Sequence, residues 1–140
     1  MSSATDSVAW AWPAEVPSVA TARHAVDAWL RTLETPAPPL GDVALVVSEA
    51  VTNVVNHAYI GLDQGEVRVE LSLNGSELAL VVADDGTGLR PRPDSPGLGY
   101  GLALMVAVSK RFEAQTVEGS GTRLCAWFSR DAAEATLPSA

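Results

Sequence analysis

Residues 45–59 read LVVSEAVTNVVNHAY. The stretch is apolar enough for a buried helix, yet it contains Glu49, Asn53, Asn56 and His57. Because residues i, i+4 and i+8 share one face of a helix, Glu49, Asn53 and His57 form a stripe, with Asn56 close by. A buried carboxylate without a partner is very costly, so this stripe must face water, a polar network or a ligand. The helix alone fits a solvated face or a site equally well, and His57 also fits an ordinary core position.

The first 58 residues are expected to form an edge strand followed by two helices. A short apolar run at residues 8–12 stops at a proline, which is typical of an edge strand. A first helix is expected with Ser18 as its N-cap, and several prolines after residue 35 end it. The helix of residues 45–59 is expected to begin with Asp42 as its cap and to end at about Ala58.

The second half of the chain reads mainly as strands. Apolar residues alternate with polar ones between Glu66 and Leu73, which predicts a strand with one wet face. Asn74-Gly75 indicates a hairpin turn. The remaining elements are expected at residues 78–83 (strand), 102–110 (helix), 114–117 and 122–129 (strands). Strands joined by tight turns predict a mostly antiparallel sheet with helices on one face, an α+β fold of two layers.

Length and composition limit the classes of protein to consider. The 140 residues suit a single domain, residues 1–140, with flexible tails at 1–7 and about 131–140. A net charge of -8 argues against non-specific nucleic-acid binding, which depends on Lys and Arg. The single cysteine, Cys125, allows no internal disulfide and fits a small core residue. Neither a signal peptide nor a membrane-spanning run is apparent, so we expect a cytoplasmic protein.

A first glycine-containing segment, VVADDGTGL, covers residues 81–89. The apolar strand ends at Asp84, and Gly86 and Gly88 follow. A carboxylate at a strand end often lies at the mouth of a pocket, and glycines let a backbone approach a ligand closely. An ordinary Asp-Gly turn is the alternative interpretation.

A second segment, GLGYGLALM, covers residues 97–105 and places three alternating glycines before an apolar helix. Free N–H groups at a helix N-terminus suit a phosphate group, so the segment fits a phosphate-binding loop. A flexible hinge is the alternative. The glycine spacing matches neither the dinucleotide fingerprint nor the Walker A loop.

The motifs together are more specific than each of them alone. In order they are Glu49-x-x-x-Asn53-x-x-x-His57, Asp84-x-Gly86-x-Gly88, Gly97-x-Gly99-x-Gly101-Leu102 and Gly121-Thr122. This pattern, over roughly residues 41–128, resembles the GHKL ATPase superfamily, and most of all its small bacterial anti-sigma factors that are serine/threonine kinases. The resemblance implies a Bergerat-type α/β sandwich, as in histidine-kinase ATPase domains, with ATP and Mg²⁺ as cofactors. It also implies frequent homodimers, a sigma-factor partner and phosphorylation of a STAS-type anti-sigma-factor antagonist.

The resemblance implies a role for each matching residue. Glu49 resembles the general base, and Asn53 resembles the ligand of the Mg²⁺ ion that bridges the phosphates. Asp84 resembles the carboxylate that accepts a hydrogen bond from the adenine amino group, and Thr122 resembles the residue that supports it. The other positions implied to contact the nucleotide are His57, Gly86, Gly88, Leu89, Gly97, Leu98, Gly99, Tyr100, Gly101 and Leu102.

Some features depart from the family pattern. The segment between Asp84 and Gly101 is short and has no lysine, which leaves Arg90 and Arg92 as candidates for a phosphate contact. Tyr100 stands where the family often has an aliphatic residue or Phe. Two alternatives stay open: an ATP-binding regulatory module without catalysis, and a stand-alone histidine-kinase-like catalytic domain. We expect no direct contact with nucleic acid or a membrane.

Overall fold

The computed structural model describes residues 6–33, 38–62, 65–86, 96–117 and 120–130, with only the backbone for residues 96–100 and 117. The expected tail at 131–140 and most of the one at 1–7 lie outside this part of the chain. The elements in chain order are β1 (Ser7–Pro13), α1 (Pro17–Leu30), α2 (Leu40–Asn53), the π-helical turn η1 (Val54–Ala58), β2 (Glu66–Asn74), β3 (Glu77–Asp84), α3 (Pro96–Val108), β4 (Arg111–Val117) and β5 (Gly121–Ser129).

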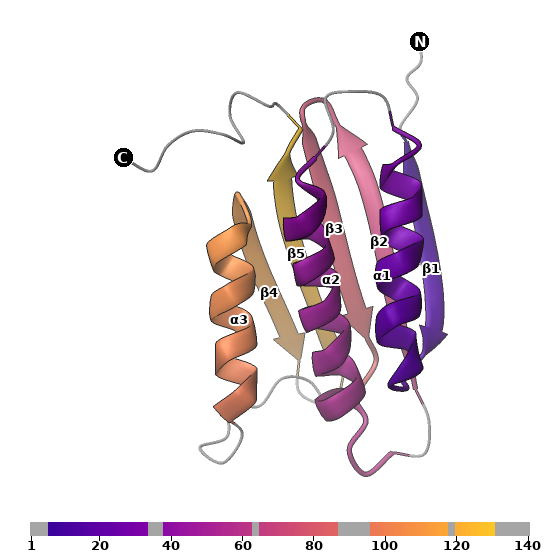
Figure 1. Cartoon of the computed structure of the whole chain (residues 1–140). Helices are drawn as coiled ribbons and strands as arrows, with labels where there is room; N and C mark the ends of the chain where they lie inside the picture. Colours follow the sequence, from indigo (N-terminus) through magenta and orange to yellow (C-terminus); the bar gives the residue numbers. More distant parts are fainter. Residues whose placement is uncertain (1–5, 34–37, 63–64, 87–95, 118–119, 131–140) are drawn as a thin grey trace.

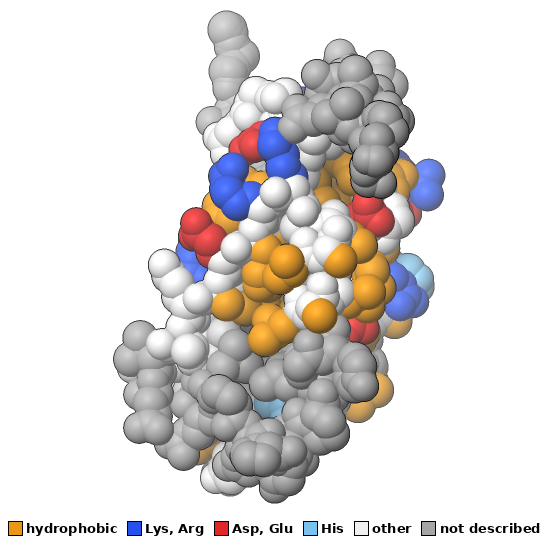
Figure 2. Space-filling view, turned by 90° about the vertical axis from the view of Figure 1, so that its left-hand side faces the viewer, with side chains coloured by type: hydrophobic (Ala, Val, Ile, Leu, Met, Phe, Trp, Pro, Cys, Tyr) orange, Lys and Arg blue, Asp and Glu red, His pale blue; other side chains and the backbone are white. Residues whose placement is uncertain are grey.

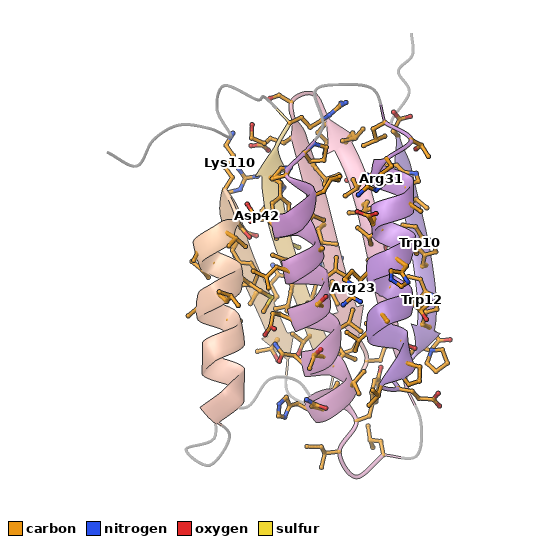
Figure 3. All side chains as sticks on the ribbon, viewed as in Figure 1. Trp10, Trp12, Arg23, Arg31, Asp42 and Lys110 are labelled. Atoms are coloured by element: carbon orange, nitrogen blue, oxygen red, sulfur yellow. The ribbon has the colours of Figure 1, made fainter. Side chains whose placement is uncertain are left out.

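Five strands form one sheet in the order β1-β2-β3-β5-β4, and every neighbouring pair is antiparallel. The three α-helices lie side by side on one face of this sheet (Figure 1). The predicted two-layer α+β fold is therefore confirmed. Strand β1 is an edge strand, as expected, and Trp10 and Trp12 stack on each other there with ring centroids 5.7 Å apart (Figure 3).

The alternation in β2 decides which face of the sheet meets the helices. Every second residue from Val67 to Leu73 is buried, and these side chains join the core formed with α1 and α2. The intervening side chains, including Arg68 and Glu70, belong to the other face. The same face is buried in the neighbouring strands. Val69 pairs with Val82, Val82 pairs with Leu124, and all three side chains are buried.

The two predicted helix caps are wrong. Helix α1 begins at Pro17, a residue that suits the first helical position because its ring fixes φ and it lacks an N–H group. Ser18 therefore lies inside the helix, where it is buried. Helix α2 begins at Leu40, so Asp42 lies in its first turn, where a negative charge is favourable next to the helix dipole (Figure 3).

The helix that carries the polar stripe of Glu49 and Asn53 changes from α to π geometry partway along. The chain is helical to Ala58, as predicted, but the α-helix ends at Asn53 and residues Val54–Ala58 form a π-helical turn. A π turn holds slightly more residues than an α turn, so the α-helical periodicity ends at Asn53. Such turns occur frequently at functional sites.

Helix α3 differs from the sequence prediction at its start. It begins at Pro96, so the three glycines between residues 97 and 101 lie in its first turns and not in a preceding loop. Proline at the first helical position favours this start. Beyond the glycines, the helix is apolar on all sides, and its outer face leaves Leu104 and Val106 exposed (Figure 2).

The β2–β3 hairpin turns at Gly75-Ser76, one residue later than Asn74-Gly75, because Asn74 still pairs with Glu77. Gly75 has a φ of +62°, as the first central residue of a type II′ turn requires. Gly75→Ala is expected to lower the free energy of unfolding by about 1 kcal/mol, since a side chain disfavours this backbone conformation. No atom lies within 4 Å of the added methyl group, so a clash adds nothing.

Gly41→Ala is the matched control, measured by urea unfolding alongside Gly75→Ala. Gly41 also has open space around its missing Cβ, but it lies in the first turn of α2. Alanine there is expected to raise the free energy of unfolding by about 0.5 kcal/mol. Changes of the same sign in the two variants would contradict the assignment of the turn.

Candidate functional site

A pocket opens between the helix layer and the sheet, where β3 ends. The space free of atoms in it measures about 330 Å³, including its solvent-facing part. A few polar side chains stand among apolar ones in its lining, as is usual for ligand pockets. Its lining residues are Ala50, Asn53, Val54, His57, Ala58, Val82, Asp84, Thr122 and Leu124.

Asp84 supplies the pocket with a buried carboxylate. Its Oδ1 accepts a hydrogen bond of 2.8 Å from the N–H group of Gly86, and the N–H group of Thr122 donates to the same carboxylate. Burial raises the pKa of Asp84, and these two hydrogen bonds oppose the rise. The remaining acceptor capacity suits a ligand donor such as an amino group on a ring.

Two glycines close the wall around Asp84. A Cβ atom on Gly86 would lie 2.0 Å from the carbonyl oxygen of Ala58, and one on Gly121 would lie 2.1 Å from the carbonyl oxygen of Asp84. Gly121 also has a φ of +101°. Glycine is thus required at Gly86 by close packing against the π-helical turn, a reason that the sequence pattern did not reveal. Gly88 lies outside the described residues.

A second polar group lies where α2 meets α3. A Cβ atom on Gly101 would lie 3.0 Å from Oε1 of Glu49 and 3.6–3.8 Å from the amide nitrogen and oxygen of Asn53. Nδ2 of Asn53 is buried and has no hydrogen-bond partner among the described residues. A buried amide group without a partner is costly, so this atom is a candidate for contact with a ligand.

The first turn of α3 adds backbone donors to this region. The first four N–H groups of a helix have no partner within the helix, and in α3 they include those of Gly97, Leu98 and Gly99. Such a terminus favours anions. The side chain of Tyr100 is not described, and Leu89, Arg90 and Arg92 lie outside the described residues.

The remaining predicted site residues have different surroundings. His57 lines the pocket, whereas Asn56 is exposed. Thr122 supports Asp84 through its backbone N–H group, while its hydroxyl group makes a long, 3.4 Å contact with that of Thr116. Leu102 packs against the hydrophobic core and not in the pocket lining.

Several lining residues were missed in the sequence. The apolar walls of the pocket come from Ala50 and Val54 on one layer and from Val82 and Leu124 on the other. Val82 and Leu124 lie in strands that were expected from the sequence, but only the pairing of β3 with β5 brings them together. Nothing in the local sequence signals that pairing, because α3 and β4 lie between the two strands in the chain.

The residues present fit a magnesium ion held together with a ligand. The described residues include no group of three or more His, Cys, Asp or Glu side chains that could hold a metal by themselves. Mg²⁺ is usually held by one or two protein oxygens together with waters and substrate phosphates. The amide oxygen of Asn53, near Gly101, would supply one such oxygen donor.

Comparison with known proteins identifies the class that this fold and site define. The family model of the histidine kinase-like ATPase domain matches residues 12–128. The chain therefore belongs to the histidine kinase-like ATPase domain family, a family of ATP-binding domains. The resemblance inferred from the sequence is confirmed.

Curated relatives with substantial similarity are named anti-sigma F factor. The protein of that name from Clostridium beijerinckii is 31% identical over 116 residues, which cover 75% of this chain and 81% of the relative. The one from Pasteuria penetrans is 33% identical over 115 residues, covering 74% of this chain and 77% of the relative. These relatives support membership of an anti-sigma-factor kinase family.

A solved structure supports the fold. The blue-light activated histidine kinase of Erythrobacter litoralis is similar over 87% of this chain, with a TM-score of 0.59 and 21% sequence identity. This chain spans 42% of that kinase. Within the described part of the present chain, no helix has both the length and the apolar character needed to cross a bilayer.

Proposed function

We propose that the protein is an ATP-dependent serine/threonine kinase that phosphorylates a STAS-type anti-sigma-factor antagonist and that also sequesters a sigma factor. One observation carries the proposal: Glu49 and Asn53 converge on Gly101 at the start of α3, beside the pocket that contains Asp84. In this proposal the carboxylate of Glu49, the amide group of Asn53 and the pocket with the buried carboxylate of Asp84 bind different parts of one nucleotide.

The pocket is assigned to the adenine ring. Asp84 accepts a hydrogen bond from the exocyclic amino group, and the apolar walls formed by Val54, Val82 and Leu124 cover the ring. His57 lies at the same pocket, where it is available to the nucleotide. Ligand pockets typically have mostly apolar walls and a few polar groups that orient the ligand.

The phosphates are assigned to the first turn of α3 and to Asn53. In the proposed reaction, the hydroxyl oxygen of the substrate serine or threonine attacks the γ-phosphorus, the bond from that phosphorus to the β,γ-bridging oxygen breaks, and ADP leaves. Glu49 accepts the proton of the hydroxyl group. Asn53 is the residue that would hold Mg²⁺, an ion that neutralises charge on the transferring phosphoryl group.

The proposed sigma-factor partner follows from the relatives named anti-sigma F factor. The antagonist as a second partner and a cytoplasmic location are further parts of the proposal. The exposed side chains of Leu104 and Val106 give α3 an apolar outer surface suited to contact with another protein (Figure 2). A homodimer is part of the proposal as well.

Phosphoryl transfer to a purified STAS-type antagonist is the direct test. The protein is incubated with Mg²⁺ and γ-³²P-labelled ATP, and we expect label on the antagonist that resists acid, because serine and threonine phosphates are acid-stable. An antagonist with its acceptor serine or threonine changed to alanine serves as the control and should stay unlabelled.

The other outcomes of this assay separate the alternatives. Acid-labile label on a partner would favour the stand-alone histidine-kinase-like domain. ATP binding in calorimetry without transfer to any antagonist would favour the non-catalytic module, and either result would contradict the proposed activity. Sigma-factor binding is tested separately by co-purification with and without ATP.

A further inference from the structure

The turn after β3 is held by side chains that do not line the pocket. The hydroxyl group of Tyr59 accepts a hydrogen bond of 2.9 Å from the backbone N–H group of Asp85 and donates one of 2.6 Å to the carbonyl oxygen of Glu66. Arg68 binds the carboxylate of Asp85 with two hydrogen bonds, 2.7 and 3.2 Å long. Asp85 is thus fixed through both its backbone and its side chain.

Close packing keeps these contacts in one geometry. A Cβ atom on Gly65 would lie 2.1 Å from ring atoms of Tyr59, so the ring lies directly against the backbone there. Gly86 in turn lies directly against the carbonyl group of Ala58, the residue before Tyr59. The π-helical turn, the start of β2 and the end of β3 therefore meet at this one tyrosine.

The ion pair between Arg68 and Asp85 adds little to the stability of the fold. The side chains of Arg68 and Asp85 are 39% and 70% exposed, and an ion pair this exposed typically contributes no more than about 1 kcal/mol to stability. Its main consequence is geometric, because Asp85 follows Asp84 directly and Gly86 donates the hydrogen bond that orients the Asp84 carboxylate. The hydrogen bond that a ring amino group donates to a carboxylate weakens steeply when its angle is poor.

We infer that Tyr59 and Arg68 are positioning residues that set the selectivity of the pocket for the amino group of adenine. They do so by holding the 84–86 turn, since neither is among the residues that line the pocket. The inference rests on the proposed assignment of the pocket to adenine. Tyr59 and Arg68 thus act on the specificity of the pocket without contacting the nucleotide.

The test compares two nucleotides in the full-length protein. Dissociation constants are measured for ATP and for purine riboside triphosphate, which lacks the 6-amino group, in the presence of Mg²⁺. The unchanged protein should prefer ATP. Tyr59→Phe, which keeps the ring packed on Gly65 but removes the hydroxyl group, should weaken ATP binding roughly 3- to 10-fold. Arg68→Gln should act in the same direction.

The ratio of the two constants distinguishes positioning from a structural defect. Positioning predicts that binding of the amino-lacking nucleotide stays within about twofold, so selectivity falls, whereas a loosened fold weakens both nucleotides equally. The control is Arg31→Gln, which removes another exposed ion pair, Arg31–Asp27 at 2.7 Å on α1, and should leave the ratio unchanged.

Failure of the inference and failure of the proposed function give different results. If the unchanged protein bound both nucleotides equally, the adenine assignment itself would be wrong. If it preferred ATP and both variants kept the same preference, only the positioning role of Tyr59 and Arg68 would be overturned.

Discussion

Glu49→Gln is expected to lower the rate of phosphoryl transfer about 100- to 10,000-fold, the range typical for losing a general base. The amide group has nearly the same shape as the carboxylate but does not accept the substrate's proton. Glu49 is absent from the lining of the pocket proposed for adenine, so ATP affinity is expected to change less than twofold. Single-turnover labelling of the antagonist measures the rate, and calorimetry measures the affinity.

Glu70→Gln is the matched control for this prediction. Glu70 is an exposed glutamate on β2, on the sheet face away from the helices, so the same chemical change there should leave transfer intact. Equal labelling by Glu49→Gln and the unchanged protein would overturn the base role. A variant that lost ATP binding together with transfer would instead make Glu49 a binding residue.

Asp84→Asn is expected to weaken ATP binding by about 1.5–3 kcal/mol, roughly 10- to 150-fold, because the proposed hydrogen bond to adenine loses its charged acceptor. The asparagine oxygen still accepts the hydrogen bond from Gly86, so the turn should keep its shape. Calorimetry with ATP measures the loss. Unchanged affinity would show that the pocket does not hold adenine.

Because the pKa of Asp84 is raised, Asp84→Asn should also change how the stability of the protein depends on pH. In the folded protein the pKa lies above its unfolded value because of burial, so the ionised carboxylate disfavours folding at pH values above the raised pKa. That cost fades as the pH falls through the raised pKa toward the unfolded value. Asn has no such cost, so Asp84→Asn should be at least as stable as the unchanged protein at neutral pH.

The raised pKa of Asp84 also predicts how ATP affinity changes with pH. The ionised form of Asp84 is the better acceptor, so ATP affinity should fall as the pH falls through its raised pKa, beginning at a higher pH than for an ordinary aspartate. Asp84→Asn should lack this component. Urea unfolding and ATP titrations over a pH series measure both effects, and a pH dependence that survives in the variant would assign it to another group.

Much of the fold was predictable because its signals are local. The alternation from Val67 to Leu73 and the glycine at position 75 identified the hairpin, and β1 was recognised as an edge strand by the proline that ends it. Helix starts were less predictable. Ser18 is a good cap by itself, but Pro17 lies just before it, and the helix begins there.

The candidate site was predictable as a set of motifs but not as a geometry. The sequence placed Glu49, Asn53 and His57 on one stripe; in the structure Asn53 and His57 line the same pocket, whereas Glu49 lies outside this lining and close to Gly101. It also placed the glycines from 97 to 101 in a loop, whereas they lie in the first turns of α3. The position of Glu49 depends on how α2 packs against α3, which a periodic pattern does not encode. The start of α3 has a local cause, because proline suits the first helical position and Pro96 lies there.

The sequence by itself determined that an acidic, apolar-cored domain of 140 residues carries the ordered motifs of an ATP-binding family. These features need only the identity and spacing of residues along the chain. The tertiary structure alone decided that Gly101 lies against Glu49 and Asn53, and that Tyr59 reaches Asp85, 26 positions away. The reason is physical: these contacts arise from strand pairing and helix packing between distant segments, and such contacts have no periodic signature in the sequence.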